Sequence, residues 1–99
     1  MPALDTQELL SKLKALKPTI IAQYRAREIR LFGSFVRGEQ KANSDIDLLV
    51  EFTEDADLFD LIGVSLFLEE KLQRKVDVVP RWALRAELRE SVLHEAITV

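Results

Sequence analysis

Cysteine is absent from this sequence of 99 residues, and histidine occurs only once. The chain can therefore form no disulfide and no thiolate metal site, and a metal site built from several histidines is excluded. No apolar run approaches the roughly 20 residues that cross a bilayer, and the opening MPALDTQELL is not an apolar signal segment. These absences lead us to expect a cytoplasmic protein that does not associate with a membrane.

An excess of positive charge is also missing, since the formal net charge is -3. Binding nucleic acid needs a basic surface that neutralises phosphates, so we expect no stable nucleic-acid binding by this chain alone. Hydrophobic residues make up 47% of the sequence, which is enough for a globular core. No linker or repeat divides the chain, and residues 1–99 are expected to form a single domain.

The clearest chemical pattern lies in residues 31–52. An apolar run, Ile29–Phe32, ends at the pair Gly33-Ser34. Ten residues later the segment Asp45–Asp47 leads directly into a second apolar run, Leu48–Val50. This order predicts a strand, a tight turn, a short helix, a loop, and then a strand that carries two carboxylates.

These residues suggest how the two strands could hold a ligand. Asp45 and Asp47 project to the same side of a strand and repel each other unless a cation lies between them. Mg²⁺ accepts one or two such carboxylates and keeps its other positions for water and phosphate oxygens. Gly33 allows a ligand to approach the backbone closely, and Ser34 would begin a helix whose N–H groups favour phosphate. The pattern predicts a metal-dependent nucleotide site.

Residues 33–52, GSFVRGEQKANSDIDLLVEF, resemble the signature of the DNA polymerase beta-like nucleotidyltransferase superfamily: Gly-Ser, about ten residues, then Asp-x-Asp. The short chain is most similar to the minimal nucleotidyltransferase branch, known mainly as antitoxins encoded beside HEPN-domain toxins. A second Asp-x-Asp, Asp55–Asp57, has no Gly-Ser turn before it and is not part of the resemblance. We expect an α/β fold with a small mixed sheet of three to four strands and helices packed mainly on one face.

Two further residues are candidates for the site. Asp77 interrupts the apolar strand predicted for residues 75–80, which costs free energy unless the carboxylate is exposed, paired or bound to metal. The resemblance implies that Asp77 is the third carboxylate of the superfamily, and the alternative is a solvent-facing residue of an edge strand. Arg37 follows Ser34 by three residues and could reach a phosphate, or it could simply pair with Glu39 at the surface.

The remaining elements are expected to be helical. Asp5 is a candidate N-cap, and Pro18 is expected to end that helix and start another. The helix predicted for residues 58–73 has apolar residues over more than one stripe, so it either meets another protein or is buried on two sides. A C-terminal helix is expected to carry the apolar residues Trp82, Leu84, Leu88 and Val92 and, as an ordinary helix residue, His94.

The resemblance implies a reaction in which AMP passes from ATP to a tyrosine of a HEPN-domain toxin and pyrophosphate is released. It implies ATP phosphates bound at Gly33 and Ser34, and two Mg²⁺ ions held by Asp45, Asp47 and Asp77. The length of the chain supports a protein acceptor, because almost all of it is needed to build the nucleotide site and the acceptor must bring its own recognition surface.

Two other functions remain open from the sequence. The chain could be an antitoxin that blocks its partner by binding alone, with a vestigial site, although all three candidate carboxylates are present. It could also transfer a nucleotide to a small molecule, as aminoglycoside nucleotidyltransferases do, although no acceptor domain is evident.

Overall fold

The computed structural model describes residues 4–99, in which helices and strands alternate along the chain. The elements are α1 (Thr6–Tyr24), β1 (Ala26–Phe32), α2 (Ser34–Arg37), β2 (Ile46–Phe52), α3 (Leu58–Leu72), β3 (Val76–Pro80), the 3₁₀ turn η1 (Arg81–Ala83), α4 (Ala86–Glu95) and β4 (Ile97–Thr98).

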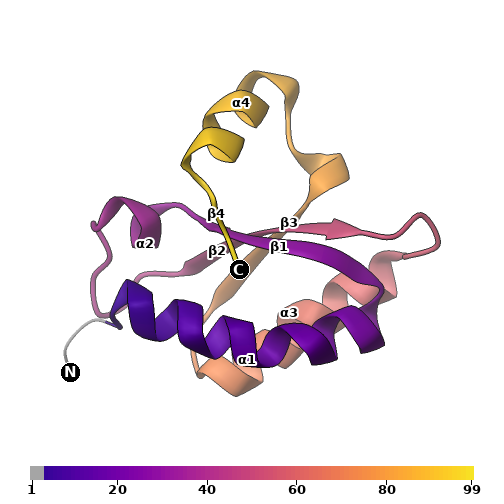
Figure 1. Ribbon diagram of the computed structural model, residues 1–99, viewed down its shortest axis with the longest axis horizontal. Helices are drawn as coiled ribbons and strands as arrows, with labels where there is room; N and C mark the ends of the chain where they lie inside the picture. The colour runs from indigo at the N-terminus through magenta and orange to yellow at the C-terminus, as the bar shows by residue number, and fades with distance from the viewer. Residues whose placement is uncertain (1–3) are drawn as a thin grey trace.

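The four strands form one mixed sheet in the order β3-β2-β1-β4. Strand β1 is antiparallel to both β2 and β4, whereas β2 and β3 are parallel and are connected through α3. A parallel pair needs such a crossover, while β1 and β2 need only α2 and a loop between them. Helices α1 and α3 lie together on one side of the sheet, and α4 stands apart from them (Figure 1). The expected α/β architecture is confirmed.

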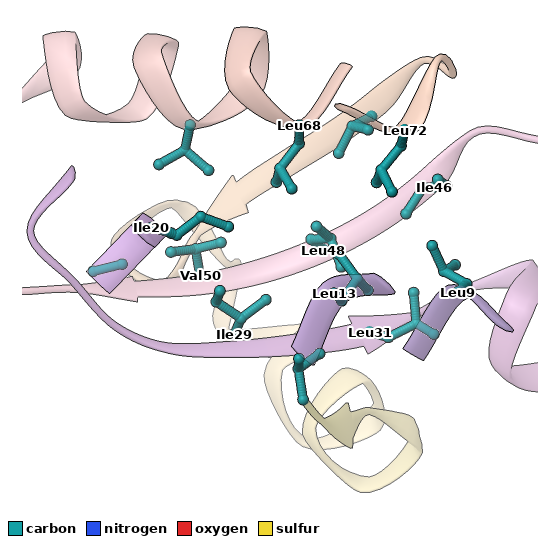
Figure 2. Close-up of a cluster of buried hydrophobic side chains, with 14 of the residues drawn as sticks. Leu9, Leu13, Ile20, Ile29, Leu31, Ile46, Leu48, Val50, Leu68 and Leu72 are labelled. Carbon is teal, nitrogen blue, oxygen red and sulfur yellow. The ribbon is translucent and has the colours of Figure 1, made fainter. Parts of the chain in front are cut away.

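Alternating residues of β1 and β2 separate two faces of the sheet. Ile29, Leu31, Leu48 and Val50 are fully buried beneath α1 and α3, on what we call the closed face. Figure 2 shows these side chains packed with residues of the two helices, among them Leu9, Leu13, Ile20, Leu68 and Leu72. The residues between them project to the other side, which we call the open face. Burial of the apolar side chains therefore fixes which polar side chains face outward.

Helix α1 differs from the prediction at Pro18, because it continues through this residue to Tyr24. The expected break is wrong. Proline removes one backbone hydrogen bond, but Pro18 is exposed, so water can reach the carbonyl group left without its partner. Leu13 and Ile20, both fully buried, attach the helix to the core on either side of Pro18. Asp5 is the N-cap as expected, and its carboxylate accepts from the Gln7 amide at 2.7 Å.

The C-terminal segment also differs from the prediction. Trp82 and Leu84 do not belong to the last helix: Trp82 lies in η1, and α4 begins only at Ala86. No residue of α4 is buried, so its apolar residues provide little packing energy. The chain then returns to the sheet as β4, where the Val99 amide donates to the Ile29 carbonyl at 2.9 Å. His94 is on α4, as expected.

Helix α3 agrees with the prediction within one residue. Asp57 caps it, accepting from the amides of Phe59 and Asp60 while the Asp60 carboxylate accepts from the Asp57 amide. Within residues 4–99, no helix is both long enough and apolar enough to cross a membrane.

Candidate active site

The sheet brings two of the candidate carboxylates onto the same face. Asp47 on β2 lies directly opposite Asp77 on β3 in the parallel register. Ile46 and Leu48, the neighbours of Asp47, are fully buried on the closed face, so Asp47 projects to the open face. Asp45 is exposed and immediately precedes β2. Residues 30 positions apart in the sequence are thus adjacent in the fold.

Asp47 is in an environment that disfavours its negative charge. Burial raises the pKa of its carboxyl group, and the charges of Asp77 and Asp45 raise this pKa further. The positive charge of Arg37 acts in the opposite direction, but the net effect is still a raised pKa. The charges of Asp77 and Asp45 thus act on Asp47, and a cation between the carboxylates would relieve this repulsion.

The donor set suits Mg²⁺, which binds oxygen ligands and needs only one or two protein carboxylates. Among residues 4–99, no three acidic or histidine side chains converge closely enough to form a ready-made metal cluster. Like charges repel, so carboxylates without a cation between them are more stable when separated. Coordination of Mg²⁺ by Asp45, Asp47 and Asp77 remains a prediction.

Gly33 occupies the turn between β1 and α2 and lies against Asp47. Its dihedral angles, φ 81° and ψ -151°, belong to a region that is almost restricted to glycine. A Cβ atom at this position would collide with Asp47 Oδ2 and lie only 3.0 Å from Asp47 Cγ. The glycine is therefore needed both for the turn and for the close approach of the backbone to the carboxylate.

Helix α2 is short but firmly attached. Phe35 is buried, and the Thr6 hydroxyl donates to the Phe35 carbonyl at 2.6 Å, which joins α2 to the start of α1. Ser34 is half-buried at the first position of α2, next to Gly33. A helix of four residues has a weak dipole, so its contribution to phosphate binding must come from local N–H groups and from nearby positive charge.

Arg37, at the end of α2, is a positive charge close to this turn in the sequence. Its Nε donates to Glu39 Oε1 at 2.8 Å, and its Nη1 donates to Glu95 Oε1 at 2.9 Å. These carboxylates raise the pKa of Arg37. The pairing with Glu39 that the sequence suggested is confirmed, while phosphate binding by Arg37 remains a prediction. Glu95 was missed because it follows Arg37 by 58 residues and no local pattern connects them.

The loop before β2 is held by hydrogen bonds to Ser44. The Ser44 hydroxyl accepts from the Lys41 amide at 2.7 Å, and Arg74 donates to the Ser44 carbonyl at 3.1 Å. These contacts fix the chain immediately before Asp45. The position of Asp45 relative to β2 is therefore defined by the loop as well as by the strand.

The chemistry of a known family fits this geometry. The model of the nucleotidyltransferase domain family matches residues 7–99 of the chain. This chain belongs to the nucleotidyltransferase family. A relative, the protein adenylyltransferase MntA of Thermococcus cleftensis, is 38% identical over 99 residues, which cover 100% of each chain.

Solved structures agree with this assignment. One described as that of a minimal nucleotidyltransferase has a TM-score of 0.85 and 40% sequence identity, and the match covers 97% of each chain. A toxin-antitoxin crystal structure with AMP-PNP has a TM-score of 0.67 and 25% identity, with 96% of this nucleotidyltransferase and 72% of that chain covered. The match to the toxin-antitoxin structure thus includes nearly the whole chain.

A charged group that the sequence did not indicate lies farther along the open face of this nucleotidyltransferase. It surrounds a shallow depression lined by Glu28, Arg30, Leu49, Glu51 and Arg81. Glu28 and Arg30 form an ion pair at 3.1 Å. The depression has no interior space for even a water molecule, so it cannot enclose a nucleotide.

Proposed function

We propose that this chain is a protein adenylyltransferase that transfers AMP from ATP to a tyrosine hydroxyl of a HEPN-domain toxin, releases pyrophosphate, and thereby acts as the antitoxin. The observation that carries the proposal is the position of Asp47, which faces Asp77 across the strand register and is contacted by the Gly33 turn. The turn that we assign to the phosphates thus lies next to the carboxylates that we assign to the metal, which supports the proposal. The reaction belongs in the cytoplasm, where ATP is available.

Each candidate residue has a defined task in this proposal. The backbone at Gly33 and Ser34 receives the distal phosphates, and Arg37 exchanges its carboxylate partners for phosphate oxygens. Asp45, Asp47 and Asp77 hold Mg²⁺, which when bound neutralises phosphate charge and stabilises the attacking and leaving oxygens. Positioning and charge neutralisation provide most of the catalysis in such sites, so the reaction requires no cysteine or histidine.

The arrangement of the strands also supports one direction of approach for the acceptor in this proposal. The Gly33 turn follows β1, whereas Asp77 lies on β3, and β2 with Asp47 separates the two. With the distal phosphates at the Gly33 turn, pyrophosphate leaves on the β1 side. An in-line displacement then requires the acceptor hydroxyl to approach from the β3 side, next to Asp77.

Three findings support a protein acceptor. Residues 7–99 match a nucleotidyltransferase domain, so almost the whole chain is used for the nucleotide site and its support. The Thermococcus relative is named a protein adenylyltransferase. The structural match at 25% identity is a toxin-antitoxin complex with an ATP analogue. That the toxin has a HEPN domain is what the resemblance to the minimal nucleotidyltransferase branch implies.

The test uses the purified chain, Mg²⁺ and ATP labelled at the α-phosphate, with the product of the neighbouring gene as acceptor. We expect label on a tyrosine of the acceptor, and none when the double variant Asp45→Asn, Asp47→Asn replaces the wild type. Label that persists with this variant would show that the carboxylates do not carry the reaction. Omission of Mg²⁺, or its removal with a chelator, should abolish labelling in the wild type.

A second candidate, neutralisation by binding alone, is favoured by the exposed apolar side chains of α3. The same double variant separates the two functions. A pure binding antitoxin would suppress the activity of its partner equally well after both substitutions, since asparagine preserves the shape of the surface. Labelling of a small hydroxyl compound by the chain alone would instead indicate a small-molecule substrate.

A further inference from the structure

Arg74 lies between α3 and β3, and its guanidinium group contacts two other segments of the chain. Its Nη1 donates to the Ser44 carbonyl at 3.1 Å. The carbon atom of the same guanidinium group lies over the Phe35 ring, 5.8 Å from its centroid. The residue is half-buried, and among residues 4–99 it forms no ion pair. Arg74 therefore contacts groups that it can hold in place rather than a charge that it could neutralise.

Each of these contacts belongs to a different part of the candidate site. Ser44 immediately precedes Asp45. Phe35 is the second residue of α2, next to the turn that we assign to the phosphates. Arg74 itself precedes Asp77 by three residues, on the segment that leads into β3. Its side chain thus joins the segments that carry the phosphate turn and two of the three candidate carboxylates.

Asp45 is the candidate carboxylate that the sheet holds least. Asp47 and Asp77 lie within paired strands and are opposite each other in the parallel register. Asp45 is exposed and precedes β2, so its own backbone lies outside the strand pairing. The position of the Asp45 carboxylate therefore depends on how the residues on either side of it are held.

Both residues that flank Asp45 are held by the segment before β3. The Ile46 amide donates to the Lys75 carbonyl at 3.0 Å, and the Ser44 carbonyl accepts from Arg74. The first bond joins two backbones and needs no particular side chain, whereas the second depends on the residue at position 74. Arg74 is thus a side chain through which the sequence controls where Asp45 lies.

The pair of contacts suits an arginine better than a lysine. A guanidinium group is planar, so it can donate a hydrogen bond along its edge while its face lies against an aromatic ring. An ammonium group is a compact, strongly hydrated charge on a flexible stem, and it would not connect the Ser44 carbonyl and the Phe35 ring in a fixed geometry. The substitution Arg74→Lys retains the charge and removes the connection.

We propose that Arg74 is a positioning residue, which sets where Asp45 lies relative to the phosphate turn by holding the Ser44 carbonyl and the Phe35 ring together. The inference rests on the proposed function for the roles of the turn and of Asp45. Residues that orient metal ligands commonly change metal affinity or activity by about 10- to 100-fold when they are replaced. Arg74 thereby acts on metal binding without contacting the ion.

The test measures binding of Mn²⁺, which prefers the same oxygen ligands as Mg²⁺ and is detected by electron paramagnetic resonance. An ATP analogue with a methylene group between the α- and β-phosphates is present, so no transfer occurs. We expect Arg74→Lys to bind Mn²⁺ about 10- to 100-fold more weakly than the wild type. The variant retains the charge and most of the stem of Arg74, so it should fold.

Arg25→Lys is the matched control. The Nη1 of Arg25 also donates to a backbone carbonyl, that of Asp55 at 2.7 Å, but this contact lies beyond the opposite end of β2 from Asp45. The control removes the same kind of bond away from the site and should leave the Mn²⁺ affinity unchanged.

Amide hydrogen exchange without metal or nucleotide provides a second measurement. The Ile46 amide should lose part of its protection in Arg74→Lys and retain it in Arg25→Lys, since only the first variant releases the loop before β2. Wild-type protection and wild-type Mn²⁺ affinity in Arg74→Lys would overturn the proposal. A lower melting temperature with unchanged Mn²⁺ affinity would also overturn it, because Arg74 would then serve only the stability of the fold.

The AMP-transfer assay separates this inference from the proposed function. Where both hold, Arg74→Lys should need about 10- to 100-fold more Mg²⁺ for half-maximal transfer, and saturating Mg²⁺ should restore most of kcat. Weaker Mn²⁺ binding by Arg74→Lys, with no transfer by the wild type, would sustain the positioning role and refute the enzymatic function. Transfer by Arg74→Lys with the wild-type dependence on Mg²⁺ would refute the positioning role alone.

Discussion

The contact between Gly33 and Asp47 is the most constrained feature of the site at the scale of single residues. In Gly33→Ala the new methyl group would both occupy a glycine-only backbone region and displace the Asp47 carboxylate. We expect a loss of about 1–3 kcal/mol of stability and loss of AMP transfer by at least two orders of magnitude. Denaturant unfolding and the labelling assay measure the two effects.

Gly38 provides the matched control for this substitution. Its φ is also positive, at 72°, but a Cβ atom there would have no neighbour within 4 Å. Gly38→Ala should therefore cost only about 1 kcal/mol, the usual penalty for a left-handed residue with a side chain, and should retain AMP transfer. If both variants lose activity equally, backbone strain rather than the contact with Asp47 explains the effect.

Asp47 itself should oppose folding when no divalent cation is present. Burial and the charges of Asp77 and Asp45 disfavour its ionised form, so Asp47→Asn should raise the melting temperature. Solvent screening at this partly exposed group limits the gain to less than about 1 kcal/mol. Added Mg²⁺ should stabilise the wild type and not the variant. A variant less stable than the wild type without Mg²⁺ would mean that Asp47 makes a favourable contact instead.

Asp55 stabilises the folded protein in a pH-dependent way, whereas Asp47 opposes folding. A hydrogen bond from Thr53 lowers the pKa of its carboxyl group below the ordinary value of 3.8. A carboxyl group with a lowered pKa in the folded state stabilises the protein above pH 3.8, and this contribution disappears as the pH falls through the folded-state value. Asp55→Asn should thus be less stable than the wild type at pH 7, with a difference that shrinks below pH 3.8 in urea titrations.

At the scale of elements, the N-cap of α3 makes its own contribution to the stability of the fold. Asp57 accepts from two amides of the first turn, whereas Asp60 closes the other half of the capping box. Asp57→Ala should cost about 1 kcal/mol, and Asp57→Ser, which retains a capping oxygen, should restore most of it. Thermal unfolding followed by circular dichroism would check whether the stability falls in the order wild type, Asp57→Ser, Asp57→Ala. Equal losses for alanine and serine would indicate that the carboxylate charge matters more than the hydrogen bonds.

Elements with a strong local signal could be predicted from the sequence. These elements are the Gly33 turn, the short helix after it, β2 and α3. Each has regularly spaced apolar residues next to a cap or a turn residue, and the predicted order of the elements matched the structure. Pro18 shows where local preference fails, because packing of the residues on both sides keeps α1 continuous. The start of α4 was misplaced for a related reason: apolar spacing at Trp82 and Leu84 resembles a helix, although these residues are in η1 and at its end.

At the scale of the whole molecule, the ion pair between Arg37 and Glu95 connects α2 with the last helix. Helix α4 has no buried residue, so this contact at 2.9 Å is one of the interactions that place it near the candidate site. Such a contact has no local sequence signal. It depends on the course of the chain through β3, η1 and α4, which explains why the site residues around Asp47 could be predicted and Glu95 could not.

The same ion pair should compete with the nucleotide. Exposed ion pairs contribute only about 0.2–1 kcal/mol, so a triphosphate, which offers Arg37 charge-assisted bidentate bonds, can replace Glu95. Glu95→Gln removes the competitor and a negative charge that acts on Asp47. We expect KM for ATP to fall by about two- to five-fold, the equivalent of that energy, and Arg37→Ala to raise it.

Glu39→Gln serves as the comparison, since it removes the local partner of Arg37 and leaves α4 in place. If Arg37 binds phosphate, both glutamine variants should lower KM, and Glu95→Gln should lower it more because Glu95 also acts on Asp47. An unchanged KM in Arg37→Ala would instead assign Arg37 to the attachment of α4. In that case Arg37→Ala and Glu95→Gln should reduce stability by similar amounts, and combining them should cause no further loss.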